Sequence, residues 1–204
     1  MNRYSRVHAE INLDAILHNL DAMHAVISEN TKIMAVIKAD GYGHGAVEIA
    51  EAIDALPYVW GYAVATVEEG ISLRNHGIVK PILILGYVFP EQYEDMIRAA
   101  IRPTVFTREM AEELSQAADR LSMDCPIHFA VDTGMSRIGY QVTDEAADEM
   151  AQLAALPHII VEGIFTHFAR ADETDKTSAR GQLALFLQMI SMLEDRGIDV
   201  PIRH

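Results

Sequence analysis

The sequence contains little cysteine and little positive charge, and each shortage argues against a class of protein. Its single cysteine, Cys125, excludes a disulfide within the chain and suits a reducing compartment. The 16 lysines and arginines are outnumbered by 30 aspartates and glutamates, which gives a formal net charge of −14. Nucleic acids and anionic membrane surfaces are themselves negative, so this acidity disfavours binding to either.

Long apolar stretches are also missing. No run is long enough to span a bilayer, and residues 1–10 contain no apolar segment of the signal-peptide type. One cysteine and the lack of a His-x-x-x-His pattern disfavour a structural zinc site. Half of the residues are hydrophobic, which is enough for one domain with a sizeable core. We therefore predict a cytoplasmic globular protein with no metal, no nucleic-acid partner and no membrane partner.

Apolar runs alternate with amphipathic segments along the chain. Strands are predicted at 33–37, 62–65, 82–85, 103–106, 127–131 and 159–165, with weaker candidates at 7–13 and 201–204. Helices are predicted between them, beginning at the capping residues Asp14, Thr66, Thr107 and Thr143 or at Pro90, and ending near Gly77 and Gly197. The repeated strand–helix order indicates βαβ units and a parallel sheet.

Two α/β architectures fit this alternation. An eight-fold (β/α) barrel, the TIM-barrel fold, takes about 250 residues, whereas this chain has 204 and supplies about six β/α units. The alternative is a doubly wound open sheet. The alternation alone does not distinguish the two.

Lys38 stands at the end of the first clear strand. The apolar run IMAVI precedes it, which predicts a strand buried on both faces, and Gly41, Gly43 and Gly45 follow at every second position. Burial of an ammonium is costly unless the amine is paired or loses its proton, and a neutral lysine amine can form a Schiff base with a carbonyl compound. The structural alternative is a lysine that ends the strand and reaches solvent.

Other polar residues follow later strands. Asp132 and Arg137 lie after the strand at 127–131, and His167 lies after the strand at 159–165. In a (β/α) barrel the carboxyl ends of the strands meet at one rim, so Lys38, Arg137 and His167 would converge there. The planar guanidinium of Arg137 suits a phenolate or carboxylate, although a surface arginine paired with an acid is the alternative. His167 could equally be a core histidine.

Several motifs resemble those of the alanine racemases. The match is nearly letter for letter in VIKADGYGHG at 36–45. It extends over essentially the whole chain, through AEINLDAI at 9–16, VATVEEG at 64–70, PILILG at 81–86, DTGMSRIG at 132–139 and THFA at 166–169. The resemblance favours the (β/α) barrel of these pyridoxal 5′-phosphate (PLP) enzymes over the open sheet.

The resemblance implies an enzyme that interconverts L-alanine and D-alanine for cell-wall peptidoglycan, with one proton acceptor on each face of the substrate Cα. Lys38 would hold PLP as a Schiff base and serve as one of the two acid/base groups. Arg137 would contact the PLP phenolic oxygen and the substrate carboxylate. His167 would lie against the pyridine ring, and Tyr42 would bond the phosphate. The active form would be a homodimer.

Two departures from the family pattern affect these expectations. Residues 1–204 would form the N-terminal PLP-binding barrel domain in truncated form, without the β-rich C-terminal domain that supplies the second base. We therefore expect this chain alone to be inactive. The second departure is Ala130, where many members carry a lysine that becomes carboxylated and orients the loop arginine. We expect an anion such as chloride, or a water, beside Arg137 instead.

Two other functions remain open. One is a PLP-binding barrel module without racemase activity, of the type that maintains PLP homeostasis, although the Val-Ser-Lys and Gly-Glu-Asn motifs of those proteins are missing. The other is a racemase for another amino acid such as serine.

Overall fold

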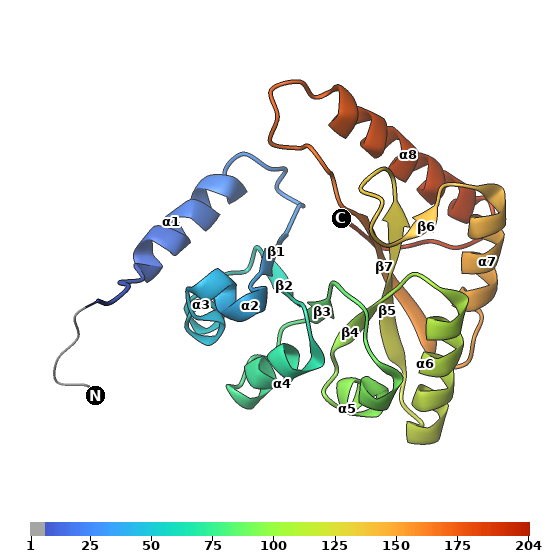
Figure 1. Cartoon of the computed structure of the whole chain (residues 1–204), viewed down its shortest axis with the longest axis horizontal. Coiled ribbons are helices and arrows are strands. Elements are labelled where there is room, and N and C mark those ends of the chain that lie inside the picture. Colours follow the sequence, from blue (N-terminus) through green and yellow to red (C-terminus); the bar gives the residue numbers. More distant parts are fainter. Residues whose placement is uncertain (1–6) are drawn as a thin grey trace. The chain divides into compact units, whose positions relative to one another are not determined.

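The computed structural model describes residues 7–204, which fall into two compact units divided between Pro81 and Ile82 (Figure 1). Strands and helices alternate along both units, and all the strand pairs defined within each unit are parallel. Parallel pairing confirms the βαβ reading of the sequence. In the described residues, no helix is both long and apolar enough to cross a membrane.

Over its described residues, 7–81, the first unit contains two strands and four helices. In chain order these are α1 (Leu13–His24), β1 (Ile33–Val36), α2 (Lys38–Gly43), α3 (Ala46–Ile53), β2 (Val59–Val64) and α4 (Val67–Asn75). The predicted cap of α4 is confirmed, because the Thr66 hydroxyl accepts a hydrogen bond from the Glu69 amide at 3.3 Å. The predicted cap of α1 is wrong. Asn12 accepts from the Ala15 amide at 3.1 Å, and Asp14 lies in the first turn.

The segment before β1, and β1 itself, also differ from the sequence prediction. No strand forms at 7–13, because this segment is largely exposed and Leu13 is already helical. Burial of β1 on both faces is also wrong, since Ile33 is only half-buried and Val36 is 42% exposed. Among the described residues of its unit, β1 pairs with β2 alone. A cavity of about 420 Å³ beside β1 is lined by Leu20, Met34 and Ile49, among others.

The second unit contains six strands, four α-helices and one 3₁₀ turn. In chain order these are β3 (Ile82–Ile84), a 3₁₀ turn at Pro90–Gln92, α5 (Tyr93–Arg98), β4 (Arg102–Val105), α6 (Arg108–Leu121), β5 (Cys125–Asp132), β6 (Tyr140–Gln141), α7 (Asp144–Ala154), β7 (Ile159–Thr166), α8 (Thr177–Glu194) and β8 (Ile202–Arg203). The strand order is β3-β4-β5-β7-β8, and the short β6, which the sequence analysis missed, pairs with β5.

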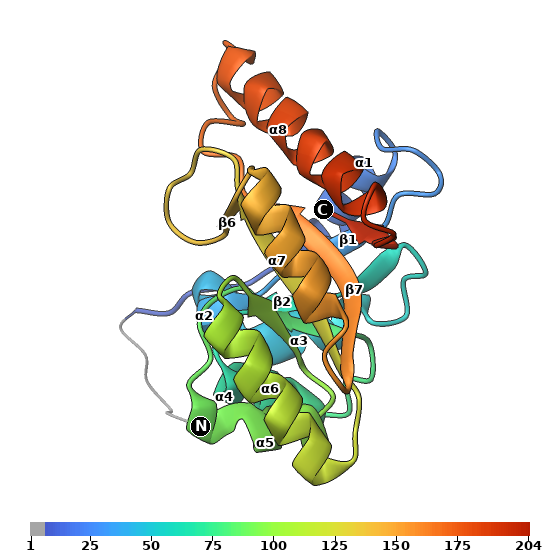
Figure 2. The ribbon, with the colours of Figure 1, turned by 90° about the vertical axis from the view of Figure 1, so that its right-hand side faces the viewer.

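Helices α6 and α7 lie along the sheet of this unit, with α8 beside α7 (Figure 2). Thr107 and Thr143 cap α6 and α7 as predicted, accepting from the Met110 and Ala146 amides at 3.3 and 3.2 Å. The predicted apolar runs form the core: β3 is fully buried, and β5 is buried over most of its length. Burial on both faces explains why these strands lack an alternating polar pattern.

Candidate functional site

Lys38 follows β1 directly and begins an unusual turn. Ala39, Asp40, Gly41 and Tyr42 all have positive φ, between +51° and +61°, so α2 is a short left-handed turn. Left-handed backbone costs roughly 1–2 kcal/mol for each L-residue other than glycine. Strain of this kind persists where the surroundings over-determine it, and such places are frequently functional sites.

Hydrogen bonds hold this strained turn on both sides. Glu69 accepts from the Ala39 amide at 2.8 Å and from the Ala65 amide at 2.7 Å, and so ties the turn to α4. Asp40 accepts from the Ala46 amide at 2.9 Å and thereby fixes the start of α3. Glycine is favoured at position 41 for two reasons. Its φ is positive, and a Cβ there would lie only 2.9 Å from Ile49 Cδ1.

The two predicted binding groups of the first unit lie on this turn. Lys38 is half-buried, and within residues 7–204 its ammonium has neither a hydrogen bond nor an ion pair. Tyr42 is 61% exposed, and its hydroxyl likewise has no partner in the described chain. The turn therefore presents a primary amine and a phenol that are not engaged by other groups of the protein.

In the second unit, Asp132 organises the loop that carries Arg137. Its Oδ1 accepts from the Gly134 and Ser136 amides, both at 2.9 Å, and its Oδ2 accepts from Gln141 Nε2 at 2.9 Å. Burial raises the pKa of Asp132, but these hydrogen bonds outweigh burial and bring the pKa below its usual value. Asp132 is therefore an ionised acceptor that shapes the loop, while Arg137 is exposed and has no partner among the described residues.

His167 follows β7 and faces a cavity of about 490 Å³. Phe168, Phe186 and His204 also line this cavity. The pairing of Val131 with Thr166 brings the ends of β5 and β7 side by side, so the loops of Arg137 and His167 leave the sheet as neighbours. The structure thus groups Lys38 with Tyr42, and Arg137 with His167. The convergence of these two pairs on one rim stays a prediction.

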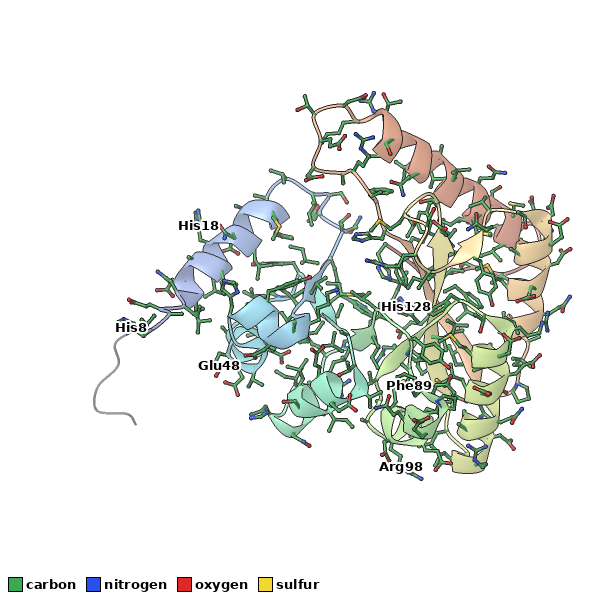
Figure 3. The ribbon with its side chains drawn as sticks, in the orientation of Figure 1. His8, His18, Glu48, Phe89, Arg98 and His128 are labelled. Carbon is green, nitrogen blue, oxygen red and sulfur yellow. The ribbon has the colours of Figure 1, made fainter. Side chains whose placement is uncertain are left out.

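A buried polar network between the strands was missed by the sequence analysis. His128 on β5, which is labelled in Figure 3, is fully buried. Its Nε2 lies 3.2 Å from Glu162 Oε2 on β7. Arg102 on β4 donates to both oxygens of Glu162, at 2.8 and 3.1 Å. His128 Nδ1 lies 2.9 Å from His204 Nε2. The signal was available in the sequence for His128 and Glu162, which interrupt apolar runs within β5 and β7, whereas Arg102 stands at the start of β4.

The network shifts the pKa of two of its members. Burial raises the pKa of Glu162, but hydrogen bonds from His128 and Arg102 and the charge of Arg102 outweigh burial and lower it to about 2. Burial of the His204 ring, with a contribution from His128, lowers its pKa to about 3. His204 is exposed as a whole residue, yet its ring stacks on Phe165 with the centroids 5.0 Å apart. Glu162 is therefore ionised and His204 neutral at pH 7.

Parallel strands alternating with helices, with the strand ends carrying the polar groups, define a protein of the β/α class. A family model described as "Alanine racemase, N-terminal domain" matches residues 11–204. The chain belongs to this family, and its fold is the incomplete (β/α) barrel of the family's N-terminal domain.

Individual relatives agree with this assignment. The chain is 41% identical over 197 residues to alanine racemase 2 of Caldanaerobacter subterraneus subsp. tengcongensis, covering 96% of this chain and 50% of the relative. It is 44% identical over 202 residues to alanine racemase 2 of Oceanobacillus iheyensis, covering 98% and 50%. The structure of the Clostridium difficile 630 alanine racemase in complex with cycloserine matches with a TM-score of 0.93 and 41% identity, covering 95% and 53%. The chain therefore spans about half the length of the curated relatives it matches.

Proposed function

We propose that this chain is the PLP-binding part of an alanine racemase. The observation that carries the proposal is the position of Lys38 within a chain of this family. Its amine follows β1 on a strained turn, is half-buried, and has no partner in residues 7–204. A primary amine held in this way is suited to an aldehyde.

The residues present fit PLP in their chemistry. Lys38 supplies an amine for the aldehyde, and Arg137 supplies an unpaired guanidinium suited to a phenolate or carboxylate. Tyr42 supplies a hydroxyl that can donate to a phosphate oxygen. When bound, PLP supplies an electron sink that makes the Cα proton of an amino acid acidic.

The protein's own residues would then orient the substrate and move the proton. Lys38 Nζ accepts the Cα proton on one face and returns it, as a general base and acid. Arg137 holds the substrate carboxylate, which fixes the orientation of Cα relative to Lys38. His167 packs beside the bound molecules. A second base for the opposite face lies outside these residues, in line with the coverage of only half of each relative.

The same resemblance supports the remaining parts of the proposal. The relatives bear the name alanine racemase, so we take L-alanine and D-alanine as substrates, with peptidoglycan synthesis as the use of the product. We also propose a homodimer in the cytoplasm. The net charge of −14 and the single cysteine agree with that compartment.

The test uses the complete product of the gene that encodes this sequence, loaded with PLP. Borohydride should fix the cofactor to Lys38, as read by mass spectrometry of the peptide, and Lys38→Ala should lose both the adduct and racemisation. The matched control is Lys32→Ala, since Lys32 is exposed and precedes β1. An adduct on another lysine would refute the role of Lys38. Faster conversion of L-serine than of L-alanine would refute the proposed substrate.

A further inference from the structure

Gln182 on α8 lies between the loops that carry Arg137 and His167. Its side chain is buried, with 4% of the residue exposed. Its Oε1 accepts from the Ala169 amide at 2.9 Å, and its Nε2 donates to the His167 carbonyl at 3.1 Å and to the Thr133 hydroxyl at 3.2 Å. One amide thus contacts both loops.

The direction of every hydrogen bond in this cluster follows from the chemistry of the groups. An amide N–H only donates and a carbonyl only accepts, so Ala169 and His167 fix which end of the Gln182 amide is oxygen. The Thr166 hydroxyl donates to the Val131 carbonyl at 2.9 Å. Thr133 must therefore donate to Thr166, 2.8 Å away, and must accept from Gln182. A continuous chain of donors runs from α8 to β5, and such chains strengthen their members cooperatively.

The two functional side chains depend on this backbone for their positions. Among residues 7–204, neither the guanidinium of Arg137 nor the ring of His167 has a hydrogen bond or ion pair, and both side chains are exposed. Their placement is therefore set by the loops from which they project. Gln182 anchors the His167 loop at two backbone groups and the Arg137 loop at Thr133.

We propose that Gln182 is a positioning residue that couples these two loops and so presents Arg137 and His167 together. This inference rests on the proposed function for its meaning in catalysis. Its structural part, the coupling of the loops, stands independently. Loosely held groups lose much of their catalytic value, so breaking the coupling should reduce turnover without removing any group that touches the substrate.

Amide hydrogen exchange tests the coupling in the complete gene product. Gln182→Met keeps the length of the side chain and removes all three hydrogen bonds. We expect the Ala169, Gly134 and Ser136 amides to exchange at least about tenfold faster, with the Phe129 amide in β5 unchanged. The matched control is Gln188→Met, an exposed position on the same helix, which should alter none of these rates. Acceleration of Ala169 alone would overturn the coupling.

A second variant separates the two loops. Gln182→Glu retains an oxygen that accepts from Ala169 but, when ionised, has no proton to donate to Thr133 or His167. It should leave Ala169 protected while Gly134 and Ser136 exchange faster. Equal protection of all three amides in this variant would refute the proposal, and so would uniform acceleration across α8, β5 and β7.

Steady-state kinetics provide the functional readout. In Gln182→Met we expect kcat for alanine racemisation to fall about tenfold or more, with bound cofactor unchanged in amount and Gln188→Met matching the parent. If the parent does not racemise alanine, the proposed function fails while the exchange result still decides the coupling. If the parent is active and Gln182→Met retains full kcat and slow exchange, the positioning role is refuted.

Discussion

Arg102 and Glu162 form a two-point ion pair between β4 and β7, although 60 residues separate them in the sequence. The pair crosses β5, where His128 contacts the same carboxylate. A carboxylate only accepts, so His128 Nε2 must carry the proton. On its other side, His128 Nδ1 lies 2.9 Å from His204 Nε2. Gly163 makes room for this arrangement, since a Cβ there would lie 2.3 Å from His128 Nδ1.

This ion pair predicts a loss of stability in acid. The pKa of Glu162 is about 2 in the fold and near its ordinary value of 4.5 when unfolded. Its contribution is therefore complete above pH 4.5 and is lost as the pH falls through 2. Glu162→Gln should lower the free energy of unfolding at pH 7 by roughly 3 kcal/mol, because it removes the buried carboxylate charge that accepts two hydrogen bonds from Arg102 and contacts His128. Urea unfolding between pH 7 and pH 2 measures both effects.

The control for Glu162 is an exposed ion pair. Glu173 contacts Arg170 at the surface, so Glu173→Gln should change the unfolding free energy little at any pH. If the two variants had the same pH dependence, the buried network would not be the source of the acid sensitivity.

A second prediction concerns the left-handed turn after β1. Gly41→Ala introduces a Cβ both at positive φ and 2.9 Å from Ile49, whereas Gly43→Ala meets nothing within 4 Å. We expect Gly43→Ala to cost roughly 1 kcal/mol through the backbone alone, and Gly41→Ala to cost at least 1 kcal/mol more. Chemical unfolding of both variants gives the difference. Equal costs would show that Ile49 moves aside freely.

Cys125 is expected to be unreactive in the fold. Burial raises the pKa of its thiol to about 12, so almost none of it is thiolate at pH 8. Titration with a disulfide reagent should proceed at least about a hundredfold more slowly than in 6 M guanidinium chloride. The sequence contains no other cysteine, so the signal needs no correction for a second thiol. Rapid labelling of the native protein would contradict the burial.

Ala130 predicts a dependence on small anions. It is 2% exposed on β5, and Arg137 has no charge partner among residues 7–204. Alanine cannot be carboxylated, so we expect chloride to supply the negative partner that the family pattern assigns to a carboxylated lysine at this position. Replacing chloride by gluconate at constant ionic strength should slow alanine racemisation by the complete gene product severalfold. Ala130→Lys with bicarbonate should remove that dependence, and equal parent rates in both salts would refute it.

The 204-residue polypeptide alone provides a further test. It spans about half the length of its relatives, and in residues 7–81 β1 is paired on one edge only. We expect no measurable alanine racemisation from it, since the proposed mechanism needs a second base that we place outside these residues. Chiral chromatography of the reaction mixture would detect turnover. Activity at the rate of the complete gene product would contradict the two-base scheme for this chain.

The sequence by itself determined the order of strands and helices and the family. Apolar runs such as 82–85 and 127–131 form strands that are buried on both faces, and this burial is why the runs show no alternation of polar and apolar residues. Thr66, Thr107 and Thr143 cap helices through local hydrogen bonds. The motifs around Lys38, Arg137 and His167 likewise identified the family. The local sequence pattern gave wrong predictions where strand pairing decides the outcome. No strand forms at 7–13, and β1 is less buried than predicted.

Only the tertiary structure decided which distant residues meet. Strand pairing brings Arg102, His128 and Glu162 together, and the packing of α8 buries Gln182 between two loops. Each of these residues, taken alone, is an ordinary polar side chain on a strand or helix. The partners described here lie 13 to 76 residues away, and no local periodicity encodes such contacts. Burying a polar group is costly without a partner, so it is the fold that determines which of these groups remain buried and paired.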